Sequence, residues 1–244
     1  MNEIALVTAN FGAVDDLKVL PQHDGIDAFY YTDEATRAQA TSEAIASWTS
    51  VIVPNYPRHD FDSRLRSRYF KHQIYRVDEV RDHRWLVWID SSLLLFETAF
   101  IRAQVDRLSQ LPPNQRLLLV PHPARQSVLE EYEFVTAEIA RGNEYLRSRY
   151  AQEKMTEQIA WYRQRGWNVR ARLFASGFWI VENSELFRRC WDDWWDQNLR
   201  FGMMCQLSLP VILEQHRCEP QALDVQIWNN AYFGIRSPRF RFSL

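Results

Sequence analysis

Five consecutive apolar residues, 85–89 (Trp-Leu-Val-Trp-Ile), run up to Asp90 and constrain the fold more than any other feature of the sequence. An uninterrupted apolar run of this length is typical of a strand that is covered on both faces. We therefore expect a central strand of a sheet with Asp90 at its carboxyl end. A carboxylate there can hold a divalent cation, but an aspartate at a strand end can also simply cap the following turn.

Similar apolar runs alternate along the chain with segments of helical period. Strands are expected at residues 4–8, 26–32, 47–54, 85–90, 116–120 and 173–181. Helices are expected at 62–75, 98–111, 130–142, 145–166, 184–197 and 205–215, the last interrupted near Pro210. This order predicts an α/β fold, with a mostly parallel central sheet and helices on both faces, in one domain spanning residues 1–244. The aromatic and basic segment at 227–244 is left unassigned.

Composition limits the classes of partner. With 29 basic and 31 acidic residues the net charge is −2, which leaves no broad positive field for nucleic acid. The three cysteines, Cys190, Cys205 and Cys218, are widely spaced, which argues against a disulfide framework and a zinc site. The first ten residues lack a secretion signal, and no stretch reaches the roughly 18 apolar residues of a membrane span. We expect a cytoplasmic protein without a transmembrane segment, which could sit peripherally at a membrane.

Four basic residues lie on the helix expected at 62–75: Arg64, Arg66, Arg68 and Lys71. Arg68 and Lys71 are three residues apart, so both side chains can point to the same place and hold a phosphate. The alternative is a solvated basic face that pairs with Asp60 and Asp62.

Two further groups of side chains have a structural and a functional interpretation. His122 and Arg125 follow the strand expected at 116–120, in a loop stiffened by two prolines, and can contact a ligand or simply lie at the surface. Three tryptophans at helical spacing, Trp191, Trp194 and Trp195, are expected in the core rather than as a sugar platform.

Seven short segments form an ordered set over most of the chain. They are Thr8-Ala-Asn-Phe-Gly12, Tyr31-Thr-Asp33, Ser67-Arg-Tyr-Phe-Lys71, Trp88-Ile-Asp-Ser-Ser92, His122-Pro-Ala-Arg125 with Glu130-Glu131, Gln158-Ile-Ala-Trp-Tyr162 with Gly166, and Gln206-Leu-Ser208. Together they resemble the glycosyltransferase-like family that includes the plant TOD and MUCI proteins and many bacterial polysaccharide-locus proteins.

The resemblance implies a GT-A-like fold, in which a nucleotide-sugar lies across the carboxyl ends of the first strands. It implies a nucleoside pocket lined by Thr8, Ala9, Asn10 and Asp33, and a diphosphate facing Arg68 and Lys71. It puts Asp90 in the place of the metal-binding Asp motif, where Mn²⁺ or Mg²⁺ could bind. It also implies that His122, Arg125, Gln158 and Gln206 surround the transferred sugar or the acceptor, with Asp90, His122, Arg125 and Gln206 assigned to catalysis.

Two segments depart from the family pattern. Relatives carry Asp-Gly-Asn or a two-acid metal motif where this chain has Asp90-Ser91-Ser92, and they carry Arg-Asp-Gln where it has Met204-Cys205-Gln206. Our hypothesis is a glycosyltransferase that moves a hexose from a nucleoside diphosphate sugar to a glycan or other hydroxyl acceptor. The replaced acids leave an alternative, a catalytically inactive relative that binds a glycan or a partner protein. A Rossmann-like methyltransferase is disfavoured because no Gly-rich loop follows the first strand.

Overall fold

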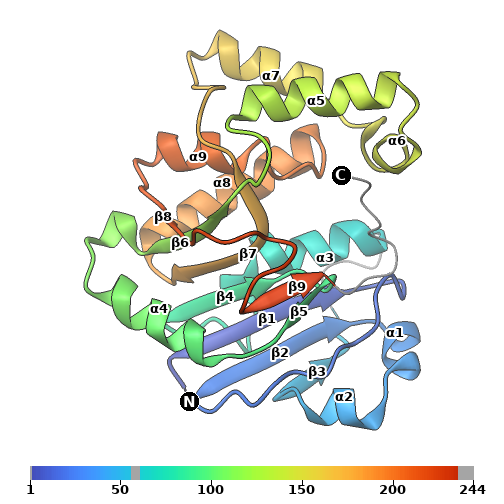
Figure 1. Ribbon diagram of the computed structural model, residues 1–244, viewed down its shortest axis with the longest axis vertical. Helices are drawn as coiled ribbons and strands as arrows, with labels where there is room; N and C mark the ends of the chain where they lie inside the picture. Colours follow the sequence, from blue (N-terminus) through green and yellow to red (C-terminus); the bar gives the residue numbers. More distant parts are fainter. Residues whose placement is uncertain (1, 56–60, 236–244) are drawn as a thin grey trace.

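A seven-stranded mixed sheet forms the centre of the computed structural model, which describes residues 2–55 and 61–235 (Figure 1). The strand order is β3-β2-β1-β4-β7-β6-β8. All neighbours pair in parallel except β7, which is antiparallel to both β4 and β6. The strands are β1 (Ile4–Asn10), β2 (Ile26–Thr32), β3 (Ser50–Ile52), β4 (Trp85–Ile89), β6 (Leu117–Pro121), β7 (Phe174–Glu182) and β8 (Gln221–Ala222).

Both faces of this sheet are buried, because successive side chains of a strand point to opposite sides. In β4, Trp85 and Val87 belong to one apolar cluster and Leu86 and Trp88 belong to the other. All five residues of the strand are buried. The expectation of a central strand at this position is confirmed.

Helices cover the two faces and add a further layer beyond one end of the sheet (Figure 1). Buried side chains of α2 and α4 pack on one face, and those of α3, α8 and α9 pack on the other. A third apolar cluster joins α5 and α7. The helices are α1 (Glu34–Gln39), α2 (Ser42–Ala46), α3 (Ser63–His72), α4 (Ala99–Ser109), α5 (Val128–Ala140), α6 (Glu144–Tyr150), α7 (Met155–Gln164), α8 (Glu185–Phe201) and α9 (Leu209–Gln215), with short 3₁₀ turns η1 (Ile74–Arg76) and η2 (Pro113–Gln115).

The observed architecture confirms the predicted α/β fold with a mostly parallel central sheet and helices on both faces. Trp191 and Trp194 are buried in the core, as expected from their spacing. Within the described residues, no helix has both the length and the apolar character that crossing a bilayer requires.

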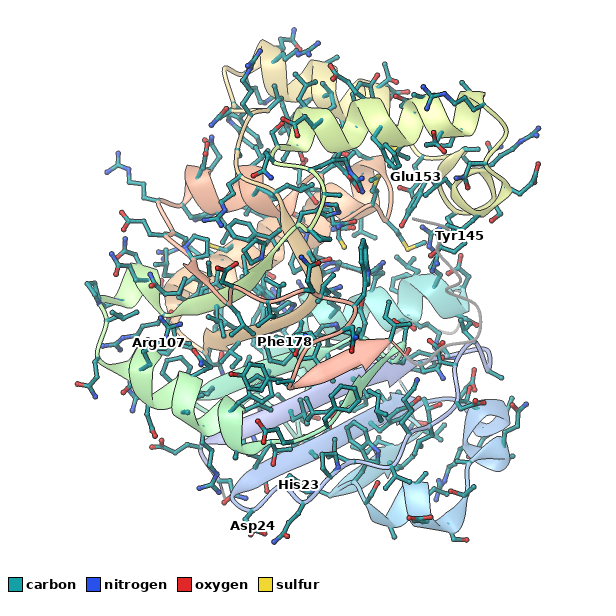
Figure 2. The ribbon with its side chains drawn as sticks, in the orientation of Figure 1. His23, Asp24, Arg107, Tyr145, Glu153 and Phe178 are labelled. Carbon is teal, nitrogen blue, oxygen red and sulfur yellow. The ribbon has the colours of Figure 1, made fainter. Side chains whose placement is uncertain are left out.

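A small antiparallel pair lies over one face of the sheet and links distant parts of the chain. Strand β5 (Leu93–Leu95), which follows β4 closely, pairs with β9 (Phe233–Ile235) near the end of the described chain. The ring of Phe233 stacks on Phe178 of β7 at 4.8 Å, and Figure 2 shows Phe178 behind the β9 ribbon. The segment that the sequence left unassigned is therefore anchored to the core as far as residue 235.

Two predicted helices differ from the structure, and two short helices were missed. The single helix expected at 145–166 is wrong: α6 ends at Tyr150, and Lys154 donates its backbone N–H to the carbonyl of Phe201 at 2.8 Å before α7 begins. Pro210 does not interrupt a helix, because α9 begins at Leu209 and its first turn tolerates a missing N–H. The short helices α1 and α2 were not predicted.

Candidate functional site

A cavity of about 620 Å³ opens at the carboxyl edge of the sheet, a size suited to a small-molecule ligand. The ends of three parallel strands contribute to its wall through Ala9 and Asn10 from β1, Asp90 after β4, and His122 after β6. Because β7 runs in the opposite direction, its first residues, among them Ser176, reach the same edge. The strand termini thus converge on one site, where open α/β sheets usually bind ligands.

Asp90, which lines the cavity, forms an ion pair with the buried Lys71. Lys71 Nζ lies 3.0 Å from Asp90 Oδ1, and its side chain is 1% exposed, against 33% for the aspartate. Nζ also contacts Ser176 Oγ at 3.3 Å, and Trp88 Nε1 donates to the same Asp90 Oδ1 at 2.6 Å. Burial raises the pKa of Asp90, but Lys71 and Arg68 lower it more, so the pKa falls below its usual value. The carboxylate is therefore ionised at neutral pH.

Arg68 lines the cavity one helical turn before Lys71. It is half-buried, and its guanidinium makes no hydrogen bond or ion pair with any residue that the structure describes. Burial lowers the pKa of Arg68, but the nearby Cys205 and Asp90 raise it by more. The pKa is therefore above its usual value, and the side chain stays charged. A charged guanidinium group without a protein partner is well suited to bind an anionic ligand.

The two other arginines of α3 have protein partners. Arg64 pairs with Glu153 at 3.0 Å, and Arg66 lies over the ring of Phe11 at 4.3 Å. Asp62, one of the expected partners of a solvated basic face, instead caps α3 by accepting the backbone N–H of Leu65 at 2.7 Å. The other expected partner, Asp60, lies outside the described residues.

The loop after β1 is shaped by a glycine in a left-handed conformation. Gly12 has φ of 78°, and a Cβ added there would lie 2.7 Å from Ser63 Oγ at the start of α3. The backbone N–H of Gly12 donates to Asp33 Oδ2 at 2.6 Å, and Asp33 Oδ1 caps α1 by accepting from Thr36 at 2.8 Å. Asp33 thus holds the loop and does not line the cavity.

The other residues expected in a nucleoside pocket divide into two groups. Ala9 and Asn10 line the cavity, but the Asn10 side chain also bonds to the backbone of Asp15 and thereby holds the following loop. Thr8 does not line the cavity, and its buried hydroxyl has no hydrogen-bond partner among the described residues.

His122 is held rigidly in the cavity wall. Its Nδ1 accepts the backbone N–H of Arg125 at 3.0 Å and that of Ala124 at 3.3 Å, so the proton of the neutral ring sits on Nε2. Burial, and then the charge of Arg125, lower the pKa of His122 to about 4. The imidazole is therefore neutral at physiological pH.

Arg125 lies behind His122 and does not line the cavity. Its guanidinium lies 3.2 Å from His122 Nε2, bonds to Glu131 and covers the ring of Phe134 at 4.0 Å. Burial raises the pKa of Glu131 despite this arginine. These contacts fix the position of the histidine.

Of the two expected glutamines, Gln206 lines the cavity, where its amide makes no hydrogen bond to the described residues. Gln158 is buried away from the cavity and donates to Tyr162 Oη at 2.8 Å. Cys205 also lines the cavity, with its thiol 3.1 Å from Ser176 Oγ. Because Ser176 also contacts Lys71, Cys205 lies next to the Lys71–Asp90 pair.

Sequence reasoning missed part of the cavity wall. Tyr145 and Tyr150 of α6, together with Ile227 and Trp228, line the cavity. Figure 2 shows Tyr145 near Glu153, on the side of the molecule where α6 lies. The polar pair Ser176-Gly177 inside an otherwise apolar strand was a usable signal, whereas nothing in the sequence pattern marked Trp228.

Two carboxylates line the cavity, Asp15 and Asp90. Asp15 Oδ2 accepts the hydroxyl of Ser91 at 2.9 Å. In the part of the chain that the structure describes, no group of three or more His, Cys, Asp or Glu side chains is arranged to hold a metal ion.

No family model matches the chain, and no curated protein matches it in sequence. It superposes on mouse xyloside xylosyltransferase 1 in its apo form with a TM-score of 0.47 and 11% identity, over 92% of this chain and 85% of that one. It superposes on the apo structure of WbbM, a bifunctional glycosyltransferase, with a TM-score of 0.46 and 9% identity, over 92% of this chain and 39% of WbbM. Both TM-scores lie below 0.5, so we base the function on the residues of the cavity.

Proposed function

We propose that this protein is a glycosyltransferase with a GT-A-like donor site, which moves a hexose from a nucleoside diphosphate sugar to a glycan or other hydroxyl acceptor. The observation that carries this proposal is that Arg68 lines a cavity at the carboxyl edge of the sheet, together with Asp90, which the buried Lys71 pairs with. Arg68 and Lys71 belong to a segment that resembles the glycosyltransferase-like family. Lys71 is paired with Asp90, whereas Arg68 has no hydrogen-bond or ion-pair partner among the described residues.

The chemistry places its main demand on the leaving group. The bond between sugar C1 and the β-phosphate oxygen breaks and its electron pair goes to the phosphate. The acceptor oxygen bonds to C1, and its proton is taken up by the departing diphosphate. Arg68 stabilises the negative charge that develops on that phosphate, while Lys71 balances the charge of the neighbouring Asp90.

The remaining wall accommodates the other parts of the two substrates. The nucleoside lies against Ala9 and Asn10 at the end of β1. The transferred sugar lies near the neutral His122 and near Gln206, whose amide N–H groups can donate to sugar hydroxyls. The acceptor enters past Tyr145 and Trp228, since aromatic rings pack well against the C–H faces of sugars.

Calorimetry with uridine, guanosine, adenosine, cytidine and thymidine diphosphates tests the donor site. We expect at least one of them to bind, and the absence of binding by all five would contradict the proposal. Release of nucleoside diphosphate from the matching nucleotide-sugar in water then tests catalysis, because a competent transferase transfers some sugar to water. Binding without release would instead favour a catalytically inactive relative that binds a glycan or partner protein.

A further inference from the structure

The carboxylate expected to bind a metal already holds a cation that belongs to the protein. Lys71 Nζ lies 3.0 Å from Asp90 Oδ1, and the same oxygen accepts Trp88 Nε1 at 2.6 Å. The lysine reaches this place from α3 with almost no exposure to solvent. One oxygen of Asp90 is therefore occupied by two donors, and the charge of the carboxylate is balanced within the protein.

The surrounding donor set does not fit Mn²⁺ or Mg²⁺, which bind carboxylates and other oxygen ligands. The two residues after Asp90 are neutral serines, and the Ser91 hydroxyl is already bonded to Asp15. A divalent ion on the remaining oxygen, Asp90 Oδ2, would face the like charges of Lys71 and Arg68. Both charges favour the ionised form of Asp90, against the effect of its burial, which raises the pKa.

We infer that Lys71 is the counter-cation of Asp90 in the place where metal-dependent phosphate sites hold a divalent cation, and that donor binding needs no divalent cation because Arg68, which lines the cavity, contacts the phosphates. This inference rests on the proposed function. The neutral residues after Asp90 fit this inference, since a site with a built-in cation has no use for a second carboxylate next to the phosphates.

The test measures nucleoside diphosphate binding by calorimetry with the same five diphosphates, once in a buffer with excess chelator and once with manganese chloride. For the diphosphate that binds, we expect dissociation constants that agree within about threefold in the two buffers. We expect Lys71→Met to weaken binding by about tenfold or more, because it leaves the negative charge of Asp90 without its counter-cation beside the phosphates. Lys154→Met is the matched control, since that lysine is exposed and does not line the cavity.

The outcomes separate this inference from the proposed function. Binding that appears only with manganese, or that tightens by about tenfold or more, overturns the role of Lys71 and leaves the donor site intact. Unchanged binding by a folded Lys71→Met variant also overturns it. Failure of all five diphosphates in both buffers overturns the proposed function and this inference with it. The comparison of buffers uses the unmodified protein, so it remains decisive if the Lys71→Met variant does not fold.

Discussion

Lys71 Nζ and Asp90 Oδ1 lie 3.0 Å apart, although one residue belongs to a helix that covers the sheet and the other follows its central strand. The pair joins the two segments that the sequence marked separately, a basic helix and an apolar strand ending in an acid. It therefore couples the stability of the fold to the charge of the cavity.

We expect Asp90→Ala to lower the free energy of unfolding by about 2–3 kcal/mol, because it leaves the buried ammonium of Lys71 without its counter-charge. Asp90→Asn should cost less, since its amide oxygen can still accept from Lys71 and Trp88. Urea denaturation measures both. The control is Asp78→Ala, which removes an exposed pair with Arg81 and should change stability by no more than about 0.5 kcal/mol. Equal losses for Asp90→Ala and Asp78→Ala would show that the buried pair does not matter to the fold.

Arg68→Gln should weaken nucleoside diphosphate binding by about tenfold or more, while unfolding changes by no more than about 0.5 kcal/mol. The reason is that Arg68 lines the cavity but bonds to none of the described residues. Calorimetry and urea denaturation report the two effects separately. Arg163→Gln is the control, because this exposed arginine of α7 lies outside the cavity. A stability loss in Arg68→Gln without a loss of binding would assign Arg68 to the fold.

The stability of the protein should depend on pH through His122, whose pKa is lowered from 6.5 to about 4. The unfolded chain takes up a proton on this side chain below pH 6.5, whereas the folded protein resists protonation, so stability is full above that pH and falls toward pH 4. The shift corresponds to about 3 kcal/mol. Burial lowers the pKa of His72 in the same direction, so the test compares the parent protein with His122→Gln. Unfolding curves at several pH values should show a smaller decline in the variant, and parallel declines would contradict the account.

Gly202→Ala should lower the free energy of unfolding by about 2 kcal/mol and the melting temperature by about 4–8 °C. Gly202 has φ of 126°, and a Cβ there would lie 2.7 Å from Cγ of Glu153, which pairs with Arg64 and accepts the backbone N–H of Met204. Gly166→Ala is the matched control: it also has positive φ, of 67°, but nothing lies within 4 Å of the added Cβ. It should cost about 1 kcal/mol. Scanning calorimetry compares the two variants. Equal losses of stability would mean that the Glu153 side chain moves away from the added Cβ at little cost.

The sequence predicted the sheet well because its strands are local apolar runs with clear ends. Residues 85–90 and 26–32 could be assigned from their own composition, and the convergence of their carboxyl ends followed from parallel pairing. The ends of α6 and α7 could not be assigned in this way. The bond from Lys154 to Phe201 that separates them joins residues far apart in the chain.

In the candidate site, too, some residues could be predicted from local sequence and others depend on contacts between distant parts of the chain. Asp90, Arg68 and Lys71 belong to recognisable segments, and the structure brings them together. Trp228 joins the cavity because the pairing of β5 with β9 returns the end of the chain to the sheet, and no local pattern encodes that pairing. Arg125 and Gln158 also belong to recognisable segments, but they contact protein groups and do not line the cavity, which their positions in the sequence could not show.

A crystal structure of the protein with the nucleoside diphosphate that binds most tightly tests the central claim most directly. The account predicts density for the diphosphate in contact with Arg68 and next to Asp90, and for the nucleoside next to Ala9 at the end of β1. Density for the phosphates elsewhere on the molecule, with Arg68 unchanged and without a ligand, would contradict it.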